Sequence, residues 1–127
     1  MSSRILRTLG QQLERTGHFS EARTLLEQSL STAESVPGTD DTSLAILRFE
    51  LAGNALETQD NARSRSLYEQ ALATFDRALG TTHPYAAMTR SRLALLDERA
   101  GQRLKAEATI GDVLPLSVLG GERHIGY

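Results

Sequence analysis

The chain has 127 residues, of which 39% are hydrophobic, and 14 basic residues face 16 acidic ones for a net charge of −2. This length favours one domain over two. The slightly acidic balance argues against a general nucleic-acid binder, whose surface is normally basic. The absence of cysteine excludes disulfides, thiolate zinc sites and cysteine nucleophiles.

The N-terminal 17 residues contain arginines but no apolar core of a secretory signal, so we expect a first structural helix there. An arginine-rich transit peptide is the alternative. No stretch approaches 18 consecutive apolar residues, which predicts that no helix spans a membrane. The lack of a signal and of cysteine favours a cytoplasmic protein. Thirteen arginines against one lysine, Lys105, indicate a GC-rich bacterial genome.

A repeat of 42 residues runs through the chain. The letters LLEQSL at residues 25–30 recur as LYEQAL at residues 67–72. Three residue pairs also stand 42 residues apart, namely Leu9-Gly10, Leu51-Ala52 and Leu93-Ala94. The same spacing separates three small residues, Ala22, Ser64 and Ala106. Several matches at one spacing are hard to obtain by chance, so the repeat is taken as real.

The first unit, about residues 1–38, is predicted to form two helices. Apolar residues from Ile5 to Leu13 follow a helical period, and Gly17 then ends the first helix. A second apolar stripe begins at Ala22. Val-Pro-Gly at residues 36–38 ends it, because proline cannot continue a helix.

The second unit, about residues 39–80, repeats this plan with helices near 42–58 and 61–79, and Asp40 and Asp41 are placed to cap the first of them. No segment shows the alternation of a strand.

The third unit, about residues 81–114, begins near Pro84 and has Gly101 between its expected helices. Residues 1–114 should therefore form one all-α domain of six helices in three hairpins. Residues 115–127 form an apolar tail, where a repeat array normally needs a polar cap.

These units resemble the tetratricopeptide repeat, which has a Leu-Ala or Leu-Gly pair, a glycine between helices, and Ala-x-x-x-Leu, -Tyr or -Ile in the second helix. The residues that carry the resemblance are Leu9-Gly10, Gly17, Ala22 and Leu26 in unit one, Leu51-Ala52 and Tyr68 in unit two, and Leu93-Ala94, Gly101, Ala106 and Ile110 in unit three. The 42-residue length and the linker LGTTHP at residues 79–84 resemble the kinesin-light-chain subtype, and HEAT repeats fit less well.

The resemblance covers about residues 3 to 114. It implies an α-solenoid with a right-handed superhelix whose concave side, lined by the first helices, binds proteins or peptides. The expected function is a non-catalytic adaptor. The alternative is a homo-oligomerisation or regulatory module, in which the tail or the uncapped third hairpin docks on another surface, or a fragment of a larger protein.

No constellation for catalysis, a cofactor or a metal is found. The three histidines, His18, His83 and His124, have no metal-ligand spacing, and no nucleophile elbow, phosphate loop or calcium loop is present. Nor do aromatic residues alternate with a basic stripe, so nucleic acid is not expected as a partner.

The concave face is expected to carry one stripe of side chains from each first helix. Its residues are Arg4, Arg7, Gln11, Ile46, Phe49, Leu56, Met88, Ser91, Leu95 and Glu98, with Glu14 and Gly53 completing the stripes. A ligand would then place apolar anchors at the middle and acidic groups near Arg4 and Arg7. The alternative is that Ile46, Phe49 and Leu95 pack between adjacent helices.

Two peptide-binding styles of the family are disfavoured. Arg7, Gln11 and Arg92 could belong to the carboxylate clamp of the chaperone-binding branch, but Glu50 would repel a carboxylate and Met88 replaces a cation. The kinesin-light-chain branch grips peptides with paired asparagines before Leu-Ala, and this chain has none there. Charges elsewhere should pair within the repeat, for example Arg48 with the nearby Glu50.

Overall fold

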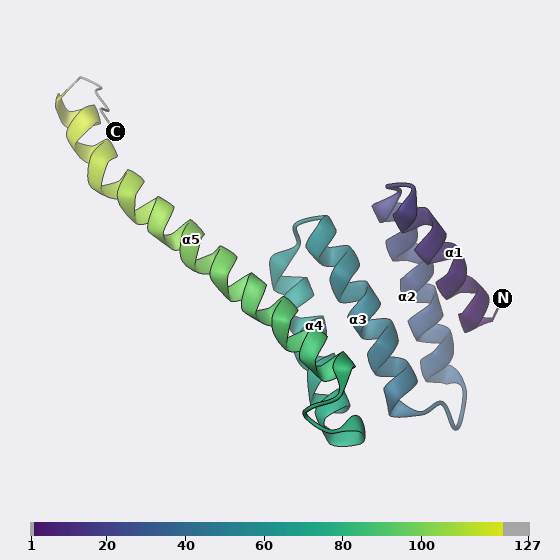
Figure 1. Cartoon of the computed structure of the whole chain (residues 1–127). Coiled ribbons are helices and arrows are strands. Elements are labelled where there is room, and N and C mark those ends of the chain that lie inside the picture. Colours follow the sequence, from purple (N-terminus) through teal and green to yellow (C-terminus); the bar gives the residue numbers. More distant parts are fainter. Residues whose placement is uncertain (1, 121–127) are drawn as a thin grey trace. The chain divides into compact units, whose positions relative to one another are not determined.

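The computed structural model describes residues 2–120, and their side chains as far as Lys105. Every secondary-structure element in this range is a helix, which confirms the all-α prediction. The helices are α1 (Ser3–Arg15), α2 (Phe19–Ser35), α3 (Asp41–Glu57), α4 (Asn61–Leu79) and α5 (Pro84–Gly120) (Figure 1).

The chain divides into one unit of residues Met1–Leu93 and a second that begins at Ala94. In the first unit α1 packs on α2, α2 on α3, and α3 on α4, so that two helical hairpins stand side by side (Figure 1). These hairpins are the first two predicted repeats. The first turns of α5 complete the unit, because Ala86 and Thr89 are fully buried in it.

Side-chain caps begin α1, α3, α4 and α5, and at α5 the His83 Nδ1 accepts from the Tyr85 N–H at 3.1 Å. The hydroxyl of Ser2 accepts a hydrogen bond from the Ile5 N–H, and the carboxylate of Asp40 accepts one from the Ser43 N–H at 3.1 Å. Asp60 caps α4 in the same way. Each cap satisfies a backbone donor that has no partner within the helix, and the expected capping role of Asp40 is confirmed.

Both hairpins turn through the same backbone motif. After α1, the His18 N–H donates to the Leu13 carbonyl at 2.8 Å, and the Gly17 N–H donates to the Glu14 carbonyl at 3.1 Å. Gly17 has a φ of 82°, in the left-handed region that glycine favours. After α3 the equivalent atoms form the same two bonds at 2.8 and 3.1 Å, with Gln59 at a φ of 62°.

The prediction of six helices and three hairpins was wrong for the described part of the chain. Helix α5 is 37 residues long and passes through Gly101 without a break. Glycine inside a helix is less favourable than alanine by about 1 kcal/mol, which does not by itself end the helix. The predicted end of the domain at residue 114 lies inside α5, as do residues 115–120 of the predicted tail, whereas residues 121–127 lie outside the described residues.

The third unit lacks the polar groups that end the first helices of the other two. The hydroxyls of Thr16 and Thr58 donate to carbonyls of the preceding helical turn at 3.0 to 3.3 Å. The equivalent residue of the third unit is Ala100, which is the best helix former. Likewise Gln102 stands where Asp60 caps α4 in the second unit.

Small residues lie where the helices of each hairpin approach most closely. Ala22 and Ser64 are completely buried, as their small size predicted. A Cβ atom on Gly10 would lie 3.0 Å from Cγ of Leu26. In the second hairpin the Ser64 hydroxyl donates to the Ala52 carbonyl at 2.9 Å. The side chain of the third small residue of the repeat, at position 106, lies outside the described side chains.

Successive hairpins are joined by an ion pair that recurs after one repeat. Arg48 contacts Glu34 at 3.1 Å, and Arg90 contacts Asp76 at 2.6 Å. The sequence led us to expect Glu50 beside Arg48, but Glu50 has other partners. The reason is geometric, since Arg48 points back toward the preceding helix rather than along its own.

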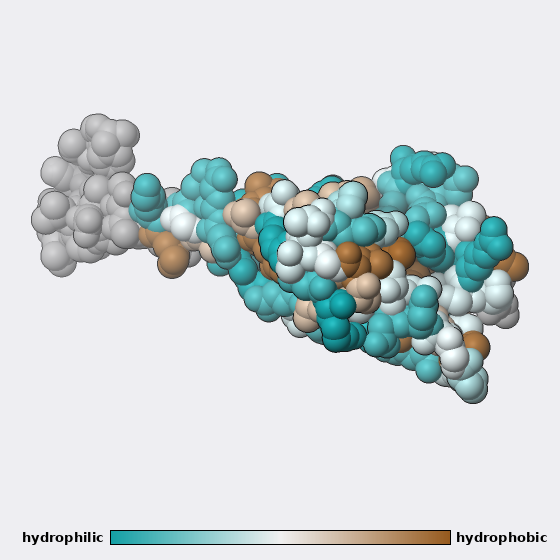
Figure 2. All heavy atoms as spheres, turned by 60° about the horizontal axis from the view of Figure 1, so that its bottom comes forward, coloured by the Kyte–Doolittle hydropathy of each residue, from teal (hydrophilic) through white to brown (hydrophobic). Residues whose placement is uncertain are grey.

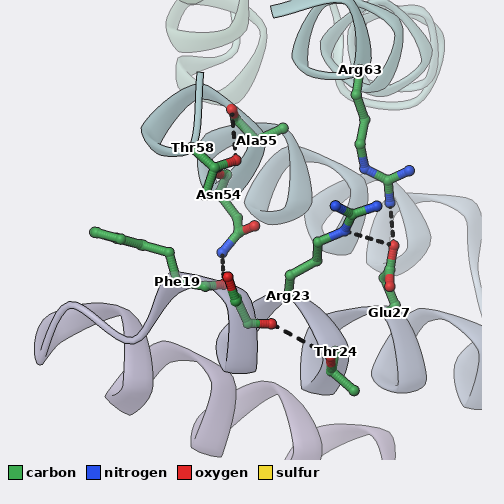
Figure 3. A network of polar contacts seen from close by, with 9 residues as sticks. Phe19, Arg23, Thr24, Glu27, Asn54, Ala55, Thr58 and Arg63 are labelled. Carbon is green, nitrogen blue, oxygen red and sulfur yellow. Dashed lines mark hydrogen bonds and ion pairs between the residues drawn. The ribbon is translucent and has the colours of Figure 1, made fainter. Parts of the chain in front are cut away.

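A second network holds α2 against α3 and α4 (Figure 3). The Asn54 amide donates to the Phe19 carbonyl at 2.9 Å. The carboxylate of Glu27 accepts from Arg23 at 3.3 Å and from Arg63 at 2.5 Å (Figure 3). These contacts fix the face of the first helices on which the candidate site lies.

Candidate functional site

A pocket of about 530 Å³ opens in the first unit, between α1, α3 and the first turns of α5. Ten residues line it, namely Gln11, Glu14, Arg15, Phe19, Phe49, Glu50, Gly53, Glu57, Tyr68 and Arg92. Most of these side chains come from α1 and α3, the first helices of the two hairpins, while Tyr68 comes from α4 behind them.

Aromatic rings form the apolar part of the pocket. The ring of Phe49 meets Tyr68 edge-on, with centroids 5.4 Å apart, and meets Phe75 in the same manner at 6.4 Å. Phe75 in turn stacks on Tyr85 at 5.1 Å. Phe49 therefore does both things that the sequence left open, since it packs between helices and also lines the pocket.

The hydroxyl of Tyr68 is the unusual polar atom of the pocket. The residue is completely buried, and burial raises its pKa. The charge of Arg92 and a hydrogen bond from its side chain oppose this rise, so Arg92 is the polar neighbour of the hydroxyl. A Cβ atom on Gly53 would lie 3.5 Å from this Oη, which is an ordinary van der Waals contact.

Glu50 of α3 contacts two side chains of α1. Its carboxylate pairs with the Arg7 guanidinium at 2.5 Å and also accepts from the Gln11 amide. Burial raises the pKa of Glu50, while Arg7 and Gln11 act in the opposite direction. The positive charge of Arg7 is therefore already neutralised within the protein.

The charge at Glu14 is not neutralised in this way. Burial is the main cause of its raised pKa, and the Asn54 amide opposes the rise. The negative charges of Glu50 and Glu57 raise the pKa further. The pocket thus has a local excess of negative potential around Glu14, although Arg15 and Arg92 also line it.

A sequence model described as the tetratricopeptide repeat matches residues 2–73 and, one repeat further along, residues 42–117. The chain belongs to the tetratricopeptide repeat family. No curated protein matches it. Tetratricopeptide repeats generally mediate protein–protein interactions and are typically not enzymes.

Two structural observations concern other classes of site in this tetratricopeptide protein. No described helix is both long enough and apolar enough to cross a bilayer. Among the described side chains, those of residues 2–105, no three histidine, aspartate or glutamate residues are grouped so that they could hold a metal ion.

The structure distributes the ten predicted groove residues over several places. Gln11 and Phe49 line the 530 Å³ pocket described above. Arg4, Arg7 and Ile46 line a second pocket of about 390 Å³, formed by α1, α3 and the end of α2. Figure 2 looks toward the loops that join α2 to α3 and α4 to α5, where apolar side chains form small patches among hydrophilic ones.

The remaining predicted residues differ in exposure. Leu56 is 8% exposed and belongs to the core. Met88 and Ser91 are exposed on the first turns of α5. Leu95 and Glu98 lie in the second unit.

Sequence reasoning missed Tyr68, Glu57 and Arg92 as a group. The signal for Tyr68 was present, because it stands where the other repeats have Leu26 and Ile110. A hydroxyl at an otherwise aliphatic core position needs a polar partner.

Proposed function

We propose that this chain is an adaptor that binds a segment of a partner protein in the pocket of the first helices, on the concave side of the tetratricopeptide array. The observation that carries the proposal is the 530 Å³ pocket in which three carboxylates, Glu14, Glu50 and Glu57, lie beside the aromatic rings of Phe19 and Phe49.

The chemistry of the pocket favours a basic side chain of the partner. Glu14 is repelled by Glu50 and Glu57, so a positive group between them lowers the electrostatic energy. The rings of Phe19 and Phe49 offer an apolar wall for the methylene groups of a lysine or arginine.

Donors are also available for the backbone of the bound segment. Arg15 and Arg92 line the same pocket and can bind its carbonyl oxygens. The buried basic side chain would supply most of the affinity, and the charges at the rim would mainly orient the segment.

This ligand differs from the one expected from the sequence, which had acidic groups near Arg4 and Arg7. Arg7 is now held by Glu50, so an acidic group there would have to compete with an existing ion pair. Apolar anchors at Ile46, Met88 and Leu95 remain part of the proposal. So do the kinesin-light-chain-like subtype, a bacterial origin and a cytoplasmic location.

A peptide array tests the proposed function. The peptides share an uncharged scaffold and carry arginine, lysine, glutamine or glutamate at one central position. We expect the labelled protein to bind the arginine and lysine peptides, to bind the glutamine peptide weakly and to ignore the glutamate peptide. Preference for the glutamate peptide would overturn the assignment of a basic ligand.

Two variants connect the array to the pocket. Glu14→Gln removes the central negative charge and should weaken the arginine and lysine spots. The matched control is Glu69→Gln, an exposed carboxylate of α4 outside the pocket, which should leave every spot unchanged. Equal loss in both variants would mean that net charge, and not this site, determines binding.

A further inference from the structure

The two hairpins show how a second helix covers a first helix in this array. Gly10 of α1 and Ala52 of α3 are equivalent in the repeat, and both are buried. Leu26 covers Gly10, and Ser64 hydrogen-bonds to the Ala52 carbonyl. The covering residues come from the following helix, 12 or 16 positions later in the chain.

The equivalent residue of the third unit is Ala94, and it is exposed. By the same spacing its covering residues are those at positions 106 and 110, within a segment of residues 102–117. The family match extends to residue 117, so this segment belongs to a repeat by sequence. Position 110, however, lies about 24 Å beyond Ala94 along an unbroken helix with a rise of 1.5 Å per residue. Within α5 as it stands, the chain cannot cover its own Ala94.

We propose that a second copy of the chain supplies the missing cover. The two α5 helices pair in antiparallel orientation, and residues 102–117 of each copy form the second helix of the third repeat of the other. The register follows from the spacing in the first hairpin, where Gly10 of the first helix faces Leu26, which comes 16 positions later. By this spacing, position 94 of one copy lies opposite position 110 of the other. The midpoint of that pair is position 102, beside Gly101.

Three features fit this exchange. The arrangement is symmetric, so one surface on both copies makes a closed dimer. A Cβ atom on Gly101 would meet no atom within 4 Å, and a glycine near the axis allows two backbones to approach closely. Leu104 is 63% exposed and, in this register, lies opposite Ala100 of the other copy.

The third unit lacks the turn between its two expected helices, which explains why they form one continuous helix and not a hairpin. Ala100 and Gln102 replace the threonine and aspartate that end α3 and begin α4, so the hinge is helical. A hinge that prefers one continuous helix favours exchange of the following element between copies.

The absence of cysteine permits a direct cross-linking test. The double variant Ala94→Cys/Ile110→Cys, oxidised and separated without reductant, should give a disulfide-linked dimer of twice the 13.9 kDa chain mass. Ala94→Cys alone is the matched control and should stay monomeric on the same gel, because the two copies of position 94 lie about 24 Å apart in this register. A disulfide-linked monomer, or no disulfide at all, overturns the proposal.

A second variant tests the hinge by a different readout. Ala100→Thr/Gln102→Asp restores the pattern of Thr58-Gln59-Asp60, and we expect it to close the hairpin within one chain. Sedimentation should then show a dimer for the wild-type protein and a monomer for the variant, with helical circular dichroism confirming that both are folded. A monomeric wild-type protein contradicts the exchange. Gly53→Ala, which alters only the pocket, should leave the dimer unchanged, so the two proposals can fail separately.

Discussion

Two glycines inside the first helices, Gly10 and Gly53, have opposite surroundings. At Gly10 a Cβ atom would lie 3.0 Å from the Leu26 side chain, whereas at Gly53 its nearest neighbour would be the Tyr68 hydroxyl at 3.5 Å. The first distance requires Leu26 to move, while the second is an ordinary contact. The same substitution should therefore have different effects at the two sites.

Gly53→Ala should stabilise the protein by about 1 kcal/mol, because alanine favours a helix more than glycine does. The melting temperature should rise by about 4 °C. Gly10→Ala should gain less or lose stability, since overpacking typically costs about 1–3 kcal/mol. Thermal unfolding followed by circular dichroism measures both variants, and equal shifts would contradict the close approach of α1 and α2.

The raised pKa of Glu14 predicts a pH-dependent effect on stability. Because this pKa lies above the ordinary value of 4.5 in the folded protein, folding favours the protonated carboxyl. The stability contributed in this way is complete below pH 4.5 and is lost as the pH rises through the folded pKa. Glu14→Gln should therefore raise the melting temperature at pH 7 and have much less effect at pH 4.

Asp40 provides a comparison of opposite sign. Hydrogen bonds from Ser43 lower its pKa below the ordinary value of 3.8, so it stabilises the fold above that value and less as the pH falls through the folded pKa. Asp40→Asn should lower the melting temperature at pH 7, and the difference should shrink in acid. If the change in melting temperature caused by Glu14→Gln followed the same pH trend as that caused by Asp40→Asn, a raised pKa of Glu14 would be contradicted.

At the scale of helices and turns, the ion pair between Asp76 and Arg90 joins α4 to α5. The Arg90 guanidinium contacts both oxygens of Asp76, at 2.7 and 2.6 Å, and donates to the Thr81 carbonyl at 2.8 Å. Arg77 also pairs with a carboxylate, that of Asp41, but both members of this pair are more than half exposed. Exposed pairs contribute little because water screens them.

Arg90→Ala should therefore lower the free energy of unfolding by about 1 kcal/mol, and Arg77→Ala by less than about 0.5 kcal/mol. Urea unfolding at a fixed salt concentration measures both. If the two variants lose equal stability, the contact of Arg90 with the turn has no special role.

Much of the fold followed from local sequence signals. The 42-residue spacing, the capping residue Asp40 and the turn at Gly17 predicted the first two hairpins, because each depends on residues close together in the chain. Gly101 carried the same glycine signal but lacks the threonine that precedes Gly17. A helix end requires polar partners for its backbone, and glycine supplies none.

The candidate site was less predictable, because its residues come from distant parts of the chain. Helical spacing placed Gln11 and Phe49 on one face, and both line the pocket. Nothing local indicated that Glu50 would take both Arg7 and Gln11, which lie 43 and 39 positions away. Tyr68 projects into the pocket from the helix behind, a relation that only tertiary packing reveals.

At the scale of the whole molecule, the sequence repeat continues past the two hairpins as far as residue 117. Each hairpin of an array is stabilised by its neighbours. The first helix of the final repeat therefore needs another helix packed against it. The pocket lies in the first unit, and the exposed Ala94 lies in the second.

The central claim is that a basic side chain enters the pocket that Glu14, Phe49 and Gly53 line. Calorimetric titration of the central-arginine peptide into wild-type protein and into Gly53→Ala tests it most directly, because the added methyl group occupies part of that pocket without weakening the fold. The account predicts about tenfold weaker binding by the variant, corresponding to about 1.4 kcal/mol, together with a higher melting temperature in the same sample. Unchanged affinity in a stabilised Gly53→Ala variant would contradict it.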